Sequence, residues 1–296
     1  MPTLQTVAID LGKSQCRLSA IGPAARETFV DAGSPGLAAA GGVAAALAAI
    51  LPLLERVNAV SSIGVGAAGA WAAPSAALDL ARALSQASGA PCAVASDVVT
   101  AHVGALQAAP GTLLIAGTGA AALGVDDGGV RLVDGWGPEL GDLGGGSWIG
   151  REGVRAALRA RDGLAPPTVL VDAVREHISP ATDAVTWLSG DMPVARRLAT
   201  AAPLVLDAAA EGDDAARAIA HEAVRLLTAS AVAASDLPVV ALHGGLTDHV
   251  WFRAELESAL HAAGRTVIPA AGDALDGAAL LAHRTDMPHE RFVHRA

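Results

Sequence analysis

The chain has few cysteines, few basic residues and no long apolar segment. Its two cysteines among 296 residues, Cys16 and Cys92, lack metal-ligand spacing, so both are expected to be small buried hydrophobes of a reducing compartment. Gly, Pro, Asp or Arg interrupts every alanine-rich stretch before it reaches a membrane-spanning length. No basic region followed by an apolar segment opens the chain, so we expect a cytoplasmic protein with no membrane partner.

Basic side chains are scarce as well. The chain has 20 Lys and Arg against 30 Asp and Glu, and a formal net charge of −10. Lys13 is the one lysine, so the other basic residues are arginines. Because a phosphate backbone requires a basic face, this balance argues against nucleic acid as a partner.

Several common catalytic motifs are missing or incomplete. Gly12-Lys13-Ser14 matches only the end of a P-loop, because the earlier glycine is absent. Residues 64–69 have the glycine spacing of a dinucleotide fingerprint, but no acidic residue follows about 20 positions on, and Pro74 interrupts the expected helix. The segment around Ser147 lacks the second glycine of a serine-hydrolase elbow, and the nine histidines show no paired ligand spacing.

The sequence instead contains one local pattern twice: an apolar strand, a glycine turn with a hydroxyl residue, and a returning strand. The first copy spans residues 4–20 around Gly12, and the second spans 113–125 around Gly117-Thr118-Gly119. The repetition predicts a duplicated α/β unit. We expect domains at 1–110 and 111–296, with the extreme C-terminus packing back on the first.

Strands and helices alternate along the whole chain, which predicts an α/β fold with active residues at the carboxyl ends of strands. Pro74 is expected to disturb a helix start, and Asp97 is placed like a helix N-cap. The tail from 284 to 296 is polar and carries no pattern. Further strands are predicted at 59–66, 92–95, 237–242 and 265–269, and helices at 35–57, 76–88, 98–106, 147–160, within 167–233, and at 251–263 and 278–283.

Acidic residues at strand ends beside glycine turns are the remaining chemical signal. Asp10, Asp97 and Asp142 occupy such positions, together with Thr118 and the Gly244-Gly245 pair. Any one of these carboxylates could simply cap a turn. As a set they suit phosphoryl transfer, in which backbone amides hold phosphates, one carboxylate supports Mg²⁺ and another accepts the proton of the attacking hydroxyl.

Longer motifs extend this set into a family resemblance. The sequence reads Asp10-Leu-Gly-Lys-Ser, Gly117-Thr-Gly and His243-Gly-Gly, and its most specific part runs from Gly135-Trp-Gly-Pro-Glu-Leu-Gly-Asp142 to Glu152. These motifs resemble the BadF/BadG/BcrA/BcrD ATPase family, and within it the N-acetylglucosamine kinases. The resemblance implies the fold of actin, hexokinase and Hsp70: two ribonuclease-H-like domains with ATP and sugar in the cleft between them.

The resemblance also implies roles for individual residues. Asp10 would support Mg²⁺, and Asp97 would be the catalytic base for the sugar 6-hydroxyl and contact the substrate. The family places the ATP and sugar contacts on short segments of the chain. ATP would be bound by Asp10, Gly12, Lys13, Ser14, Gly117, Thr118, Gly119, Gly244 and Gly245, and the hexosamine by Thr118, Gly119, Trp136, Gly137 and Asp142.

The implied function is an ATP-dependent kinase acting on the 6-hydroxyl of N-acetylglucosamine or glucosamine. Leu143 stands where the family usually has a carboxylate, which leaves the identity of the sugar open. Two alternatives stay open: an iron–sulfur ATPase activator of a dehydratase, and a sensor that binds sugar or nucleotide without turnover. The cysteines are not convincingly placed for a cluster. A homodimer is a family expectation only.

Overall fold

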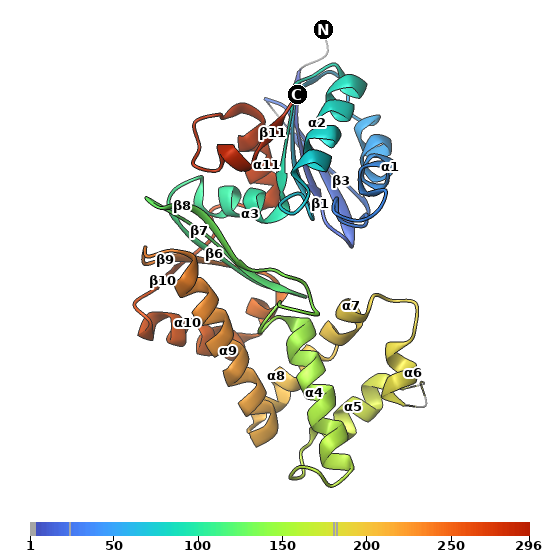
Figure 1. Cartoon of the computed structure of the whole chain (residues 1–296), viewed down its shortest axis with the longest axis vertical. Coiled ribbons are helices and arrows are strands. Elements are labelled where there is room, and N and C mark those ends of the chain that lie inside the picture. The colour runs from blue at the N-terminus through green and yellow to red at the C-terminus, as the bar shows by residue number, and fades with distance from the viewer. Residues whose placement is uncertain (1–3, 24, 180, 182) are drawn as a thin grey trace. The chain divides into compact units, whose positions relative to one another are not determined.

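The computed structural model describes residues 4–23, 25–179, 181 and 183–296, which fold into two compact units (Figure 1). Unit 1 comprises Met1–Pro110 and Ala270–Ala296, and unit 2 comprises Gly111–Pro269. Residues 270–296 thus pack with the N-terminal part of the chain, beginning with helix α11 (Ala274–His283). The sequence interpretation had placed all but the extreme end of this segment in the second domain.

Unit 1 is built on a six-stranded mixed sheet in the order β11-β5-β4-β1-β2-β3. The hairpin β1 (Gln5–Leu11) and β2 (Gln15–Ile21) continues into antiparallel β3 (Arg26–Ala32). Strands β4 (Val60–Ala67) and β5 (Cys92–Ser96) run parallel to β1, and β11 (His294–Arg295) runs antiparallel to β5. The parallel strands therefore present their carboxyl ends at one edge.

Alternation along β1 explains the layers of unit 1. Val7 and Ile9 join a core with α1 (Gly42–Leu54) and α2 (Pro74–Ser88), whereas Ala8 packs with Leu275 of α11. Successive side chains of a strand point to opposite faces, so these two cores lie on the two sides of the sheet. Helix α3 (Asp97–Leu106) accompanies α11 (Figure 1).

Unit 2 has a five-stranded sheet in the order β10-β9-β6-β7-β8. Strands β6 (Gly111–Ala116), β7 (Ala120–Asp126) and β8 (Gly129–Asp134) are antiparallel neighbours, while β9 (Val239–His243) and β10 (Thr266–Ile268) run parallel to β6. One apolar core joins this sheet to the helices of the unit. They are α4 (Gly146–Arg161), α5 (Leu170–Ile178), α6 (Ala184–Leu188), α7 (Val194–Ala199), α8 (Ala202–Glu211), α9 (Asp214–Ala234) and α10 (Val250–Ala262).

Both predicted hairpins and the α/β class are confirmed, but several local predictions are wrong. Pro74 does not interrupt helix α2; it occupies the first turn, where its missing N–H has no intrahelical partner to lose. The N-cap of α3 is Ser96, and Asp97 is the first helical residue. Strands β3 and β8 were not predicted. The tail forms a 3₁₀ turn at Glu290–Phe292 and strand β11.

The dinucleotide-like glycines serve packing. A Cβ at Gly64 would collide with the carbonyl oxygen of Ala278 in α11, and one at Gly66 would collide with Oγ1 of Thr100 in α3. Both glycines lie inside strand β4, where two helices approach its backbone closely. The sequence match at 64–69 therefore reflects close helix–sheet contact.

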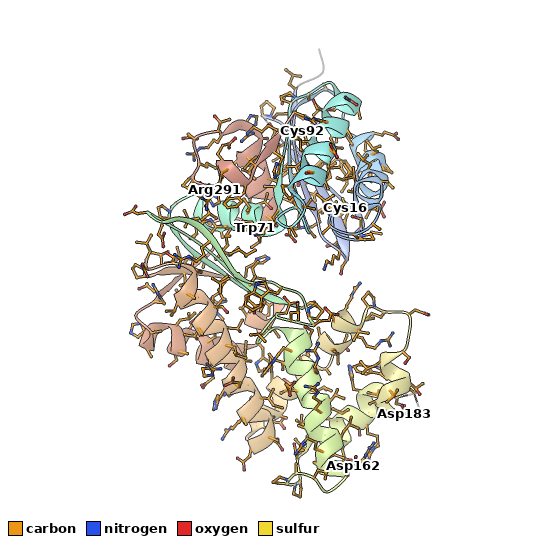
Figure 2. All side chains as sticks on the ribbon, viewed as in Figure 1. Cys16, Trp71, Cys92, Asp162, Asp183 and Arg291 are labelled. Carbon is orange, nitrogen blue, oxygen red and sulfur yellow. The ribbon has the colours of Figure 1, made fainter. Side chains whose placement is uncertain are left out.

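Both cysteines are buried within unit 1 (Figure 2). Burial raises the pKa of each thiol to about 12, and for Cys16 the negative charges of Asp10 and Asp31 add to the effect. Such thiols are neutral packing groups, as the sequence predicts. Across the part of the chain that the structure describes, no helix combines the length and the apolar character needed to cross a membrane.

Candidate functional site

Two of the predicted carboxylates lie at one edge of the sheet of unit 1. Asp10 is near the end of β1 and faces Gly66 of β4 in the parallel register. Strand β5, on the other side of β4, ends at Ser96, and Asp97 follows directly at the start of α3. Because parallel strands end together, the topology brings Asp10 and Asp97 to the same edge, as expected for an α/β site.

Asp97 combines burial with a small set of hydrogen bonds. Its Oδ1 accepts from Ser96 Oγ at 2.9 Å and from the Val98 amide at 3.0 Å. Burial raises the pKa of Asp97, and the negative charge of Asp10 adds to the rise, which the two hydrogen bonds and Lys13 oppose. The side chain keeps partial exposure. A carboxylate with a raised pKa is a stronger base than an ordinary aspartate, so Asp97 at its strand end is suited to accept a proton.

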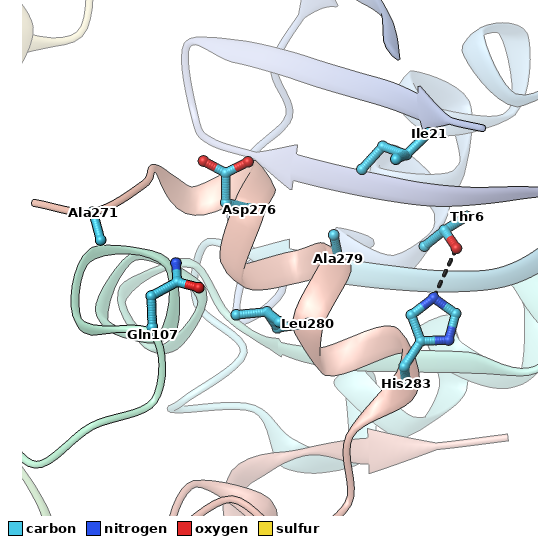
Figure 3. A pocket seen from close by; sticks show the side chains of 8 residues that line it. All are labelled: Thr6, Ile21, Gln107, Ala271, Asp276, Ala279, Leu280 and His283. Atoms are coloured by element: carbon cyan, nitrogen blue, oxygen red, sulfur yellow. Dashed lines mark hydrogen bonds between the residues drawn. The ribbon is translucent and has the colours of Figure 1, made fainter. Parts of the chain in front are cut away.

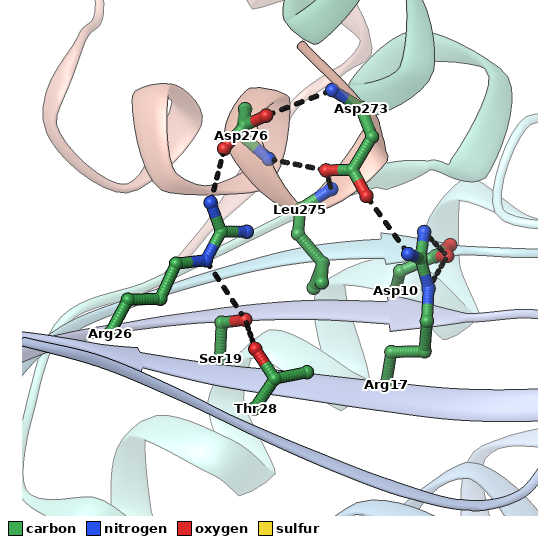
Figure 4. A network of polar contacts seen from close by, with 8 residues as sticks. All are labelled: Asp10, Arg17, Ser19, Arg26, Thr28, Asp273, Leu275 and Asp276. Carbon is green, nitrogen blue, oxygen red and sulfur yellow. Dashed lines mark hydrogen bonds and ion pairs between the residues drawn. The ribbon is translucent and has the colours of Figure 1, made fainter.

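The charge of Asp10 is paired with an arginine that the sequence interpretation missed. Arg17, its cross-strand partner on β2, donates to Asp10 Oδ2 from Nη2 and Nε and to Asp273 Oδ2 from Nη1 at 2.9 Å (Figure 4). Asp273 is the N-cap of α11 and forms a capping box with Asp276. The predicted hairpin could have revealed this ion pair, because it places Arg17 directly opposite Asp10, where opposite charges attract.

The first predicted phosphate loop is the turn between β1 and β2. The Gly12 amide donates to the Gln15 carbonyl at 2.9 Å and closes this turn, in which Lys13 and Ser14 are exposed. Gly12, Lys13 and Ser14 therefore follow Asp10 at the same edge of unit 1, and the ammonium of Lys13 acts electrostatically on Asp97. The structure therefore places the predicted site residues of unit 1 at one edge of its sheet.

Unit 2 gathers the second set of glycines. In the turn between β6 and β7, the Gly117 amide donates to the Gly119 carbonyl at 3.0 Å. The first amides of α4 dock on this turn: Gly146 donates to the Gly117 carbonyl and Ser147 to the Thr118 carbonyl, both at 2.8 Å. Gly244, at φ +109°, lies so close to β6 that a Cβ would contact the backbone of Ala116 and the Gly117 amide. Gly117–Gly119 and Gly244-Gly245 thus form one backbone cluster.

The predicted sugar-facing segment lies next to this turn in unit 2. Asp142 Oδ1 accepts from the Ala120 amide at 3.3 Å, and a Cβ at Gly119 would touch the Asp142 carboxylate. Trp136 is 65% exposed and presents its indole to solvent, while Gly137 has a φ of +90°. The structure therefore places Asp142 against Gly119 of the turn that also contains Thr118, and the indole of Trp136 is exposed six residues earlier in the chain.

Mg²⁺ is the metal predicted for this site. Among the described residues, no group of three or more His, Cys, Asp or Glu side chains is arranged to hold a metal ion. Mg²⁺ in phosphoryl-transfer sites takes one or two carboxylates and completes its shell with phosphate oxygens and water. Asp10 near the end of β1 and Asp97 directly after β5 lie on the two sides of β4, and their carboxylates fit such a shell of oxygen donors.

A cavity of about 480 Å³ lies along helix α11 in unit 1 (Figure 3). Thr6 Oγ1 and His283 Nε2 meet at 2.7 Å at one end, and Asp276 stands at the other. No predicted site residue lines it, and it has neither a glycine turn nor paired carboxylates, so it is not the candidate site. Its lining consists of Thr6, Ile21, Gln107, Ala271, Asp276, Ala279, Leu280 and His283.

Similarity to known proteins agrees with this arrangement. The chain resembles an N-acetyl-D-glucosamine kinase of Dictyostelium discoideum, with 32% identity over 121 residues, which are 40% of this chain and 38% of that protein. The chain thus matches well under half the length of this curated relative.

Solved structures match over most of the chain. A Chromobacterium violaceum protein provisionally named an N-acetylglucosamine kinase has 25% identity and a TM-score of 0.78, covering 95% of this chain and 100% of its own. A Streptomyces griseus glucokinase of the ROK family, solved with glucose and AMPPNP, has 20% identity and a TM-score of 0.54, covering 94% and 99%. These neighbours confirm the predicted fold of two ribonuclease-H-like units.

A family model provides the assignment. It is described as the BadF/BadG/BcrA/BcrD ATPase family, and it matches residues 55–282, well over half of the chain. The match runs from the segment before β4 to the end of α11 and includes Asp97, both glycine elements of unit 2 and Asp142. The chain therefore belongs to the BadF/BadG/BcrA/BcrD ATPase family.

Proposed function

We propose that this protein is an ATP-dependent kinase that phosphorylates the 6-hydroxyl of an amino sugar, N-acetylglucosamine or glucosamine. The observation that carries the proposal is Asp97: a carboxylate with a raised pKa, at a strand end beside Asp10, in a chain of this ATPase family. Proton acceptance is the one chemical step that phosphoryl transfer to an alcohol asks of a side chain.

In the proposed reaction, Asp97 takes the proton of the sugar hydroxyl while the hydroxyl oxygen attacks the γ-phosphorus of ATP. The bond between the γ-phosphorus and its bridging oxygen breaks, and ADP leaves. Mg²⁺, when bound with ATP, would offset the phosphate charge, and Asp10 would hold it directly or through water. Gly12, Lys13 and Ser14 would contact phosphates.

Unit 2 would supply the remaining contacts. Gly117, Thr118 and Gly119 would donate backbone amides to phosphate, since no Cβ stands between these glycine amides and a ligand. The Gly244-Gly245 pair would border the adenosine. For the sugar, Asp142 would accept hydroxyl hydrogens, Trp136 would offer its exposed face, and Gly137 would allow close approach; Thr118 and Gly119 would also contact it.

The two alternatives differ in their support. A dehydratase activator needs cysteine thiolates for a cluster, and burial with a pKa near 12 makes Cys16 and Cys92 unsuitable. A sensor that binds without turnover retains one supporting observation, the apolar Leu143 beside Asp142. We also propose that the protein is cytoplasmic and forms a homodimer.

A coupled ADP-release assay over amino sugars and plain hexoses tests the proposal. We expect sugar-stimulated ADP release with an amino sugar, loss of the signal when EDTA removes Mg²⁺, and a product phosphorylated at position 6 by NMR. Calorimetry on the same sugars separates the sensor: binding of ATP and sugar without any product would overturn the kinase. Absence of both binding and turnover would overturn both readings.

A further inference from the structure

Two aspartates of the segment between β8 and α4 hold an unusual backbone conformation. Asp134, the last residue of β8, has φ +60°, and Asp142 has φ +54°. Only a few per cent of non-glycine residues adopt this left-handed region, and they keep it where the surroundings enforce it. Aspartate enters this region more often than most residues, and contacts with the surroundings decide whether it stays there.

The carboxylate of Asp134 supplies that constraint. It is buried, with 3% of the residue exposed, and each of its oxygens accepts one backbone amide: Oδ1 from Asp142 and Oδ2 from Leu143, both at 2.8 Å. A buried carboxylate requires such donors, and two amides of one turn satisfy it. Leu143 thus takes part through its N–H.

Gly141 packs closely against this carboxylate. A Cβ at Gly141 would collide with Asp134 Oδ1, and it would also crowd the side chain and amide of Trp136. The Gly141 amide donates to the Gly137 carbonyl at 2.7 Å, which closes the segment on itself. Asp134 is therefore the centre around which residues 135–143 fold.

The backbone of Asp142 is fixed where its side chain meets the second glycine turn. Its amide is held by Asp134, and its own Oδ1 accepts from the Ala120 amide beside Gly119. A shift of the Asp134 carboxylate would move the Asp142 backbone and with it the direction of the Asp142 carboxylate.

We infer that Asp134 is the positioning residue of the sugar-binding segment: it sets the conformation of residues 135–143 and aims the carboxylate of Asp142 at the substrate. The inference rests on the proposed function for the identity of the ligand, while the positioning itself can be measured without any substrate.

Hydrogen exchange measured by mass spectrometry tests the positioning. In Asp134→Asn the volume is kept, but an amide N–H faces one of the two backbone N–H groups. We expect exchange in the peptide covering 135–146 to accelerate about tenfold or more. The control is Asp126→Asn: this half-buried aspartate at the end of β7 also accepts two backbone amides, from Gly128 at 2.9 Å and Asp236 at 3.3 Å. It should leave the 135–146 peptide unchanged.

Steady-state kinetics test the consequence for the sugar. Asp134→Asn should raise KM for the amino sugar about ten- to hundredfold and leave KM for ATP within about twofold. Gly141→Ala displaces the same carboxylate without removing its charge and should reproduce this split. Asp126→Asn should leave both KM values at the wild-type level.

The outcomes separate this inference from the proposed function. Unchanged exchange in both Asp134→Asn and Gly141→Ala overturns the positioning role, as does an equal rise of both KM values. Faster exchange with an unaltered sugar KM in an active enzyme shows that the positioning does not serve the sugar, and it also overturns the inference. A wild-type protein inactive on every amino sugar refutes the proposed function, whereas the exchange result still decides the positioning.

Discussion

Arg17 donates two hydrogen bonds to the same oxygen of Asp10, from Nη2 at 2.7 Å and from Nε at 3.1 Å. Its remaining nitrogen contacts Asp273 at the N-terminus of α11, so one guanidinium links two carboxylates from distant parts of the chain (Figure 4). Asp10, Asp97 and Asp273 would together repel the phosphates of ATP. Arg17 offsets part of that charge and fixes Asp10 beside the β1–β2 turn.

Replacing Arg17 with Gln is expected to raise KM for ATP about tenfold, because Asp10 loses its paired charge and orientation. Arg17→Lys should recover part of the loss, since a lysine restores charge but not the forked geometry. Kinetics at varied ATP and a fixed sugar concentration would show the effect.

Arg26→Gln is the matched control for this experiment. Arg26 is partly exposed; it pairs with Asp276 of the same helix and donates to Ser19 Oγ (Figure 4). Its loss should lower stability by at most about 1 kcal/mol and leave KM for ATP unaltered. Equal KM values in the two variants would refute the role given to Arg17.

Asp97→Asn is expected to lower kcat roughly 100- to 10,000-fold and to raise the melting temperature at pH 7. Burial raises the folded-state pKa of Asp97, so the folded protein binds this proton more tightly than the unfolded chain does. The free energy of unfolding therefore falls as pH rises from the ordinary carboxylate pKa through the pKa of Asp97 in the folded protein. At higher pH the buried charge of Asp97 destabilises the folded protein. Asparagine carries no such penalty.

Calorimetric melting beside single-turnover kinetics measures both effects of Asp97→Asn. Asp79→Asn, on the exposed face of α2, removes an acid paired with Arg82 and should change neither quantity measurably. An active Asp97→Asn enzyme would contradict the assignment of Asp97 as the general base. A lower melting temperature of this variant would contradict the prediction that the buried charge of Asp97 destabilises the fold.

We expect the fully buried pair His102 and His289 to make the stability of the fold sensitive to acid. His289 Nε2 and His102 Nδ1 lie 3.0 Å apart, and burial together with His102 lowers the pKa of His289 to about 3. Between the unfolded value near 6.5 and this folded value, the unfolded chain binds the extra proton. The stabilisation is therefore complete above pH 6.5 and is lost as pH falls toward 3, by at most about 1.4 kcal/mol per pH unit.

Unfolding free energies measured from pH 4 to pH 8 would check this slope. His289→Gln should flatten it, even if the variant is less stable overall, because no imidazole remains there to protonate. His261 is an exposed histidine in the last turn of α10, and His261→Gln should retain the wild-type slope. Parallel curves for the wild type and both variants would rule out His289 as the source.

Gly64→Ala is expected to destabilise unit 1 by about 1–3 kcal/mol without any loss of nucleotide affinity in the folded protein. Its Cβ would collide with α11, where the Ala278 carbonyl approaches β4. Urea unfolding and ATP titration measure the two quantities. Gly22→Ala, where a Cβ makes only ordinary contacts, should be nearly neutral. A folded Gly64→Ala protein that has lost ATP binding would revive the dinucleotide interpretation.

The sequence predicted the parts of the fold that local patterns encode. Both hairpins stood out because apolar runs flank compact glycine turns, and Asp10 and Asp97 followed from their places at strand ends. Strand β3 escaped because only Phe29 among its seven residues is buried, which leaves no alternation to detect. The helix predicted at 35–57 is longer than α1 (Gly42–Leu54), because composition alone did not reveal the left-handed conformation of Gly41 just before it.

The candidate site shows the same division. Arg17 lies 256 residues from Asp273, so only the folded chain reveals that it joins the two carboxylates. Nothing in the sequence singles out Asp134, because the strand β8 that it ends was not predicted. Its importance arises from hydrogen bonds to amides eight and nine residues later, which depend on a left-handed turn that residue type does not predict.

The return of residues 270–296 to unit 1 affects the order in which the chain can fold. Helix α11 contacts β4 and α3 through Gly64 and Gly104, and β11 extends the sheet at β5, so unit 1 lacks part of its core until these last residues exist. Unit 2 is contiguous and is complete once Pro269 has been synthesised. During translation, then, the N-terminal segment of unit 1 must wait with an open sheet face while unit 2 folds, which reverses the usual N-terminal-first order.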